Sequence, residues 1–201
     1  MSNSLISKIQ QGAVRRVHFL GDSITQGCGF VSQQQTYPYQ LMLQINRLAG
    51  KLDVHSYNHA VGGATSMDGM DRVNWSERED HLPDLAFIMF GLNDVNQGVS
   101  IDDYAANLRG MIDHLREVRA AVVLLGPTPF VGREDDLAGY NQRAHEVARQ
   151  TEIPFIECLD PFYESGNLRA DMLWSDDLHL TALGQQLLAQ TVWDGLQQVD
   201  C

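Results

Sequence analysis

The sequence RVHFLGDSITQG (residues 16–27) contains a short apolar run that stops at a glycine, with a serine two residues later. Val17–Leu20 have the length and composition of a buried strand, and Gly21 ends it. Further strand-length apolar runs occur at Val54–Tyr57, Leu85–Phe90, Val122–Leu125 and Pro154–Ile156. Ser23 therefore stands where the first of five expected strands gives way to a turn.

Segments with a helical period separate these strands. The clearest runs from Ile101 to Val118, where apolar residues at steps of three and four make one stripe. Similar patterns run from Tyr37 to Gly50, from Leu137 to Ala148, and onward from about Ala182. Strands that alternate with helices predict right-handed crossovers, and so a mainly parallel sheet covered on both faces. The longest stretches that look irregular are residues 62–83 and 127–136.

The bulk properties indicate one ordinary α/β domain over residues 1–201, since a chain of 201 residues without a linker-like tract suits a single core. A formal net charge of −12 disfavours nucleic acid and anionic membrane surfaces as partners. The three cysteines form no close pair, which argues against a disulfide framework and a zinc cluster. The first residues do not resemble a signal peptide, and no apolar run approaches the roughly 18 residues of a membrane span. We expect a cytoplasmic protein without stable membrane association, and the oligomeric state stays open.

Polar or glycine residues follow three of the expected strands. Ser23 follows the first, Gly62 and Gly63 follow the second, and Asn93 follows the third. Because the carboxyl ends of parallel strands meet at one edge of a sheet, where ligands bind in open α/β folds, these residues are expected to lie together.

A serine hydroxyl is a weak nucleophile unless a base, itself oriented by a third group, lies within hydrogen-bond reach. Asp176 and His179 are three residues apart, so one helical turn places both side chains on the same side. Asp177 is two residues from His179 and would point elsewhere. The sequence thus predicts Ser23 as nucleophile, His179 as base and Asp176 as its orienting partner.

Acyl transfer also needs hydrogen-bond donors for the oxyanion that develops at the attacked carbonyl. The backbone N–H groups of Ser23 and Gly63 and the side-chain amide of Asn93 are the candidates. Gly62 offers a second amide at the same turn.

Four sequence blocks, Gly21-Asp22-Ser23, Asn58–Thr65, Gly91–Asp94 and Asp176–His179, resemble those of the SGNH (GDSL) hydrolase family in order and spacing. Leu180 departs from the proline that many members have after the histidine. The resemblance implies a flavodoxin-like three-layer α/β/α fold with a five-stranded parallel sheet. It also implies ester or thioester hydrolysis without a metal or other cofactor, and the roles given above to Ser23, His179, Asp176, Gly63 and Asn93.

Several functions remain open from the residues alone. A serine esterase for small esters is the leading hypothesis, and short acyl chains are expected because no insertion large enough for a lid domain is visible. A lysophospholipase or acyl thioesterase and a carbohydrate O-acetylesterase are alternatives within the family. Outside it stand a non-catalytic ligand-binding module and a metal-dependent phosphoesterase, the latter using Asp22, Asp94, Asp176, Asp177 and His179.

Other residues have simpler expected roles. Asp22 and Asp94 are expected to bond backbone donors around their turns. Cys28 is expected to be a small buried hydrophobic residue. Trp174 is equally consistent with a pocket wall and with the core. The six remaining histidines have no ligand-like spacing, and we expect surface or satisfied core positions for them.

Overall fold

Five parallel strands form one sheet in the order β2–β1–β3–β4–β5. The structure is a computed structural model that describes residues 4–50, 53–73 and 81–199. Part of the segment 62–83, and Cys201, therefore lie outside the described residues. The strands are β1 (Arg16–Gly21), β2 (His55–Asn58), β3 (Leu85–Met89), β4 (Ala121–Leu125) and β5 (Phe155–Ile156).

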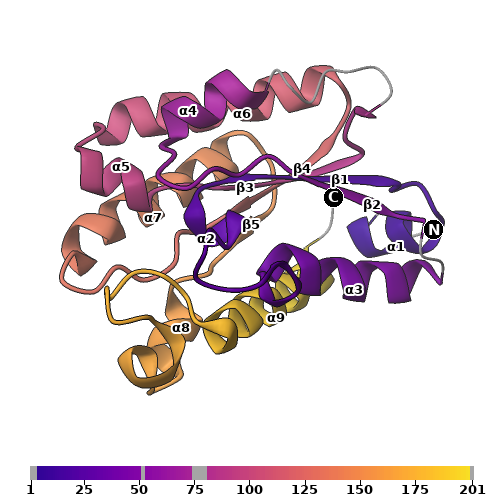
Figure 1. Cartoon of the computed structure of the whole chain (residues 1–201). Coiled ribbons are helices and arrows are strands. Elements are labelled where there is room, and N and C mark those ends of the chain that lie inside the picture. Colours follow the sequence, from indigo (N-terminus) through magenta and orange to yellow (C-terminus); the bar gives the residue numbers. More distant parts are fainter. Residues whose placement is uncertain (1–3, 51–52, 74–80, 200–201) are drawn as a thin grey trace.

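Helices cover both faces of this sheet and make a three-layer α/β/α arrangement (Figure 1). One layer contains α4 (Ser66–Val73), α5 (Leu92–Gln97), α6 (Ile101–Glu117) and α7 (Glu134–Gln150). The other contains α1 (Leu5–Gln10), α3 (Tyr37–Ala49), α8 (Asp160–Glu164) and α9 (Ala182–Gln198). The short helix α2 (Ser23–Gln26) follows β1 directly, and a 3₁₀ turn η1 (Gln33–Gln35) and a π turn η4 (Leu168–Met172) complete the elements. Within the described ranges, no helix has both the length and the hydropathy that a bilayer crossing requires.

The α/β fold class and the five strands expected from the sequence are confirmed, with no strand end shifted by more than one residue. The expected helix signals also hold. Pro38 lies in the first turn of α3, and Gly50 ends that helix in the left-handed conformation with φ of 66°. Thr181 caps α9 by accepting a hydrogen bond from the Gly184 N–H at 3.2 Å.

The expectation of irregular structure at residues 62–83 is wrong in part, because this segment contains α4. Gly69 allows α4 to pack closely against the core. A Cβ at this position would lie 2.7 Å from the Phe90 ring and 2.8 Å from Met111 Sδ. The helix expected from Leu137 likewise begins earlier, at Glu134, inside the second segment expected to be irregular.

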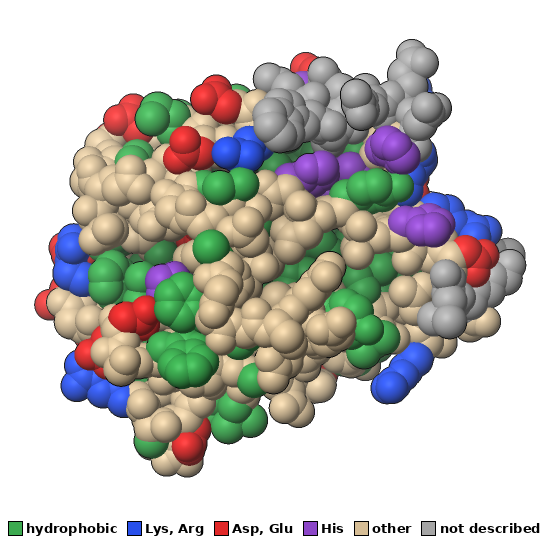
Figure 2. Space-filling model, in the orientation of Figure 1, with side chains coloured by type: hydrophobic (Ala, Val, Ile, Leu, Met, Phe, Trp, Pro, Cys, Tyr) green, Lys and Arg blue, Asp and Glu red, His purple; other side chains and the backbone are tan. Residues whose placement is uncertain are grey.

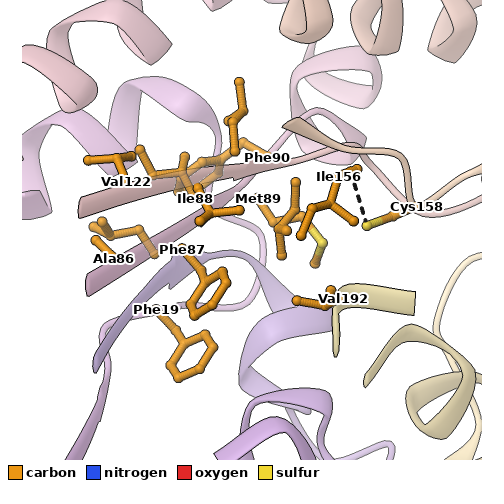
Figure 3. Close-up of a cluster of buried hydrophobic side chains, with 14 of the residues drawn as sticks. Phe19, Ala86, Phe87, Ile88, Met89, Phe90, Val122, Ile156, Cys158 and Val192 are labelled. Carbon is orange, nitrogen blue, oxygen red and sulfur yellow. Dashed lines mark hydrogen bonds between the residues drawn. The ribbon is translucent and has the colours of Figure 1, made fainter. Parts of the chain in front are cut away.

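The central strands carry the hydrophobic core. Every residue of β3 is buried, and the rings of Phe19 on β1 and Phe87 on β3 stack with centroids 5.1 Å apart (Figure 3). Strands buried on both faces are typical of parallel sheets with two helical layers. Burial of this sheet fixes the position of its carboxyl edge, to which α2 and α5 are attached.

Histidine side chains gather on the flank of the molecule where β1 and β2 lie (Figure 2). The His18 side chain on β1 is 1% exposed, and its Nδ1 lies 3.0 Å from Nε2 of His59. A second polar pair, Tyr57 and His81, joins the Tyr57 hydroxyl to His81 Nδ1 at 3.0 Å. Burial, together with the neighbouring His59, lowers the pKa of His18 to about 4.

We expect His18 to make the folded protein less stable in acid. Its folded-state pKa lies below the unfolded value of about 6.5, so its contribution is present above that pH and is lost as the pH falls toward about 4. Between pH 7 and pH 5, the free energy of unfolding of wild type should therefore fall by about 2 kcal/mol more than that of His18→Gln. Urea denaturation at both pH values measures this difference, with the exposed His145→Gln as control. Equal losses in wild type and His18→Gln would contradict the assignment.

Candidate active site

The end of β1 is built so that Ser23 is presented at the sheet edge. A Cβ on Gly21 would lie 2.3 Å from Thr25 Oγ1 and 3.0 Å from the Met89 carbonyl oxygen, so only glycine fits. The next residue, Asp22, caps α2 by accepting the Ile24 N–H at 3.0 Å. Ser23 is the first residue of α2, directly after this cap.

The Asp22 carboxyl is 1% exposed and links two turns of the site. Its Oδ1 accepts the Ile24 N–H, and its Oδ2 lies 3.4 Å from the Asn93 side-chain nitrogen on α5. Burial raises the pKa of Asp22 to about 7, against the effect of these donors. The interaction orients Asn93 toward the end of β1, as expected of a structural aspartate.

The segment that carries Asp176 and His179 is a loop rather than a helical turn. An antiparallel bridge between Leu173 and Leu180 closes it, and the Trp174 N–H donates to the His179 carbonyl at 2.8 Å. Asp177 lies at its tip with φ of 60°. The helical argument from their spacing is therefore wrong in its geometry, although the two side chains do meet.

Ser23, His179 and Asp176 form a continuous hydrogen-bonded chain. His179 Nε2 lies 2.8 Å from Ser23 Oγ, and His179 Nδ1 lies 2.8 Å from Asp176 Oδ2. The other carboxylate oxygen of Asp176 accepts the backbone N–H groups of Leu178 and His179 at 3.1 and 3.0 Å. Burial opposes ionisation of Asp176, but the hydrogen bonds from the backbone and imidazole of His179 hold its pKa below the usual value. This arrangement directs one imidazole nitrogen to a carboxylate and the other to a serine hydroxyl.

Asp177 is directed away from His179, as expected. Its carboxylate pairs with Arg169 at 2.9 Å, and its carbonyl accepts the Val131 N–H at 3.0 Å. The segment 127–136, whose conformation is not evident from the sequence, thus lies against the Asp176–His179 loop. Its Arg133 also reaches α5 by donating to the Val95 carbonyl at 3.2 Å.

Phe30 packs flat on the imidazole of His179, with ring centroids 3.7 Å apart and an angle of 9° between the planes. The sequence analysis missed this residue. It follows Ser23 by seven positions in a glycine-containing stretch, where no periodic signal marks it. The stacked ring restricts rotation of the imidazole and shields one of its faces from water. Trp174, on the same loop as His179, is 45% exposed, so it does not belong to the core.

The turn after β2 contains two adjacent glycine amides, those of Gly62 and Gly63, which differ in their hydrogen bonding. The Gly62 N–H donates to the side-chain oxygen of Gln26 at 2.7 Å. Gly63 has φ of 79°, and a Cβ there would meet no atom within 4 Å. Within the described ranges, no hydrogen-bond acceptor is assigned to the Gly63 N–H. Of the two amides that the sequence offers, Gly63 is the one compatible with an external ligand.

Asn93 lies on the first turn of α5, after Gly91, whose φ of 132° is accessible only to glycine. Its side-chain nitrogen donates to the Ala64 carbonyl at 3.1 Å and makes the long contact to Asp22. The proton directed at Asp22 is only weakly engaged at 3.4 Å. Ser23, Gly63 and Asn93 are thus brought to the same edge of the sheet, as the topology predicts.

Asp94 and Cys28 differ in how well their expected roles hold. Asp94 is buried and accepts hydrogen bonds from the backbone and hydroxyl of Ser66 at 2.6–3.1 Å, so its structural role is confirmed. Burial raises its pKa. The expectation for Cys28 is wrong, because this residue is exposed. Its Sγ packs against the backbone of Gly62, where a Cβ would lie 2.8 Å from it.

The carboxylates named for a phosphoesterase do not converge. Asp22 accepts the Ile24 N–H of its own turn, Asp94 accepts hydrogen bonds from Ser66 on α4, and Asp177 pairs with Arg169. Over the part of the chain that the structure describes, no three His, Cys, Asp or Glu side chains are arranged to hold a metal ion. The geometry favours chemistry centred on the serine hydroxyl.

Comparison with known proteins gives consistent matches over nearly the whole chain. The model of the GDSL-like Lipase/Acylhydrolase family matches residues 19–187. An acetylxylan esterase from Geobacillus stearothermophilus is 25% identical over 206 residues, which cover 89% of this chain and 92% of that protein. The esterase TesA from Pseudomonas aeruginosa is 28% identical over 199 residues, covering 96% and 94%.

Solved structures agree on the fold. The crystal structure of the Geobacillus acetylxylan esterase superposes with a TM-score of 0.77 at 22% identity, covering 90% of this chain and 94% of that one. Three related structures are described as catalytic mutants of that enzyme, in which an aspartate, a serine or a histidine is replaced by alanine. A crystal structure of TesA has a TM-score of 0.75 at 24% identity and covers 91% and 98%.

The left-handed conformation of Asp177 predicts an asymmetric response to substitution. Asp177→Gly should leave the free energy of unfolding within about 0.5 kcal/mol of wild type, because glycine adopts this φ without strain. Asp177→Ala should cost about 1–2 kcal/mol, and Asp177→Val at least as much, because a Cβ disfavours that conformation. Urea denaturation and hydrolysis of p-nitrophenyl acetate measure both effects, and activity should fall only in Asp177→Ala and Asp177→Val. The exposed ion pair with Arg169 is lost in all three variants, so it does not account for a difference among them.

Proposed function

Since the chain belongs to the GDSL-like Lipase/Acylhydrolase family and is a carboxylic ester hydrolase, we propose that it acts through an acyl-enzyme on Ser23. The observation that carries this proposal is the hydrogen-bonded chain from Ser23 Oγ through His179 to Asp176. The catalytic variants of the Geobacillus esterase replace the same three residue types, which supports the assignment.

In the proposed first half-reaction, Ser23 Oγ attacks the ester carbonyl carbon while His179 Nε2 takes the hydroxyl proton. Asp176 keeps the imidazole in the tautomer with hydrogen on Nδ1 and stabilises the imidazolium that forms. The C–O bond to the alcohol then breaks, and His179 returns the proton to the departing oxygen. Water repeats the sequence on the acyl-enzyme, with its proton taken by His179, and releases the acid and free Ser23.

The tetrahedral intermediates place negative charge on the former carbonyl oxygen. We assign its stabilisation to the N–H groups of Ser23 and Gly63 and the side-chain amide of Asn93. The availability of the Gly63 amide and the position of Asn93 beside Asp22 support this set. Removal of one such donor typically costs about 3–4 kcal/mol of transition-state stabilisation.

The surroundings of α2 favour an uncharged ester. Charged side chains lie mainly toward the borders of the face seen in Figure 2, and its centre is dominated by uncharged groups. A cavity of about 380 Å³ begins at the end of α2, outside the proposed triad, and is lined by uncharged residues, among them Gln26, Gln33, Tyr39 and Asn58. Amide, hydroxyl and aromatic groups of this kind suit a neutral, hydroxylated alcohol part better than an anionic headgroup.

A carbohydrate O-acetylesterase is therefore the second candidate, as one form of the same chemistry. Its support is the uncharged cavity beside α2 and the similarity to an acetylxylan esterase. For the lysophospholipase or acyl thioesterase alternative the described residues offer no comparable observation, and the similar protein TesA is named an esterase.

The role of Ser23 is tested by substitution. Ser23→Ala should lower kcat/KM for p-nitrophenyl acetate by at least about three orders of magnitude, because the covalent step is lost. EDTA should leave the wild-type rate unchanged, and a fluorophosphonate should label wild type but not Ser23→Ala. Ser7→Ala, in α1, is the control and should react as wild type does. Undiminished hydrolysis by Ser23→Ala would overturn the proposal.

The substrate class is tested separately. With p-nitrophenyl esters from acetate to palmitate, we expect the highest kcat/KM at acetate to butyrate. Acetylated xylo-oligosaccharides should be deacetylated faster than an acyl-CoA of equal acyl length is hydrolysed, because the cavity beside α2 lacks cationic residues. A preference for palmitate or for the acyl-CoA would favour the lysophospholipase or thioesterase alternative instead.

A further inference from the structure

The turn of residues 61–64 is held from both sides by glutamine side chains. Gln26, at the end of α2, accepts the Gly62 N–H through its Oε1 at 2.7 Å. Gln97, at the end of α5, donates its Nε2 hydrogen to the Gly63 carbonyl at 3.0 Å. The peptide unit that carries the Gly63 N–H lies between these two contacts.

We propose that Gln26 and Gln97 are positioning residues that hold the Gly63 N–H in register with the two other oxyanion donors. This inference rests on the proposed function, since it assigns a role within the same site. Neither glutamine touches the reacting atoms in the proposed mechanism. Each acts through the turn that it binds.

The turn needs external support because it is built from two adjacent glycines. Its internal hydrogen bond runs from the Ala64 N–H to the Val61 carbonyl at 3.1 Å. Glycine populates positive and negative φ with similar ease, so a Gly–Gly turn has several accessible conformations. Gly63 is exposed and has open space beside it, so packing alone does not select one. Catalytic donors, in contrast, must be held within about 0.5 Å of the productive position.

The two glutamines are attached to the elements that carry the other donors. Gln26 follows Ser23 by three positions within α2, and Gln97 follows Asn93 by four positions within α5. Residues at these spacings lie one turn apart on the same side of a helix. The Gly63 amide is therefore tied through Gln26 to the helix of the first donor and through Gln97 to the helix of the third.

The polarity of the two contacts requires an amide on each side. The Gly62 N–H needs an acceptor, which the Gln26 carbonyl supplies, and the Gly63 carbonyl needs a donor, which the Gln97 amide supplies. Methionine has a similar length and neither function. Glutamate at position 97 has a similar size but lacks the donor and adds a negative charge.

The test compares Gln26→Met, Gln97→Met and Gln97→Glu with a matched control, Gln40→Met. Gln40 is a half-buried glutamine whose amide donates to the Gln35 carbonyl at 2.7 Å, in η1. Steady-state hydrolysis of p-nitrophenyl acetate gives kcat and KM. The inhibition constant of an alkyl trifluoromethyl ketone, whose serine adduct presents an oxyanion, reports on the donors directly.

Each of the three variants should lower kcat about tenfold with KM within twofold of wild type. Each should also raise the inhibition constant of the ketone about tenfold. Gln40→Met should match wild type in all three quantities. Rates equal to those of the control, an effect confined to KM, or unchanged ketone affinity would each overturn the proposal. If a methionine variant unfolds at the assay temperature, Gln97→Glu decides, because it conserves the size of an exposed side chain, and ketone affinity at low and high salt separates the lost donor from the added negative charge.

Failure of this inference is distinguishable from failure of the proposed function. An inactive wild type, or an active Ser23→Ala, would contradict the serine mechanism itself. An active wild type with a dead Ser23→Ala and unaffected glutamine variants would contradict only the positioning role.

Discussion

The rest of the site depends on the hydrogen bonds made by the buried carboxyl group of Asp22. A carboxyl that is 1% exposed has to be satisfied by protein donors, because an unpartnered buried polar group is costly. Its Oδ1 accepts the Ile24 N–H at 3.0 Å and caps the turn after β1, and its Oδ2 lies 3.4 Å from the Asn93 amide in the turn after β3. Ser23 is then directed out of the sheet edge, since the residue before it points inward and Gly21 allows the close approach of Thr25.

The proposed acid–base half of the site comes from a distant part of the chain and is attached by a second buried polar contact. The loop with Asp176 and His179 leads directly into α9, where the buried amide of Gln185 binds two other elements. Its oxygen accepts the Tyr37 N–H at 2.7 Å, and its nitrogen donates to the Ile24 carbonyl at 2.9 Å. The start of α9 is therefore fixed relative to α2, which explains how His179 Nε2 lies within 2.8 Å of a hydroxyl 156 residues away in the sequence.

Much of this arrangement is predictable from the sequence. Apolar runs of strand length, separated by helical stripes such as that of α6, lead to a parallel sheet with helices on both faces. The rule that polar residues at the carboxyl ends of parallel strands converge then brings Ser23, Gly63 and Asn93 together. Local reasoning failed where one residue spacing fits two backbone conformations. The spacing of Asp176 and His179 looks helical, but a loop with a left-handed residue brings the two side chains together.

The sequence by itself determined the order of strands and helices, the residue types at the strand ends and the family, because these depend on periodicity and on motifs read along the chain. Only the tertiary structure decided which glycine amide is available, that Phe30 covers the imidazole, and that Gln26 and Gln97 hold the turn of residues 61–64. The physical reason is that these contacts join side chains to backbone groups of other segments. Each amide or ring has many possible partners, and only the packing of the layers leaves one within hydrogen-bond or stacking distance.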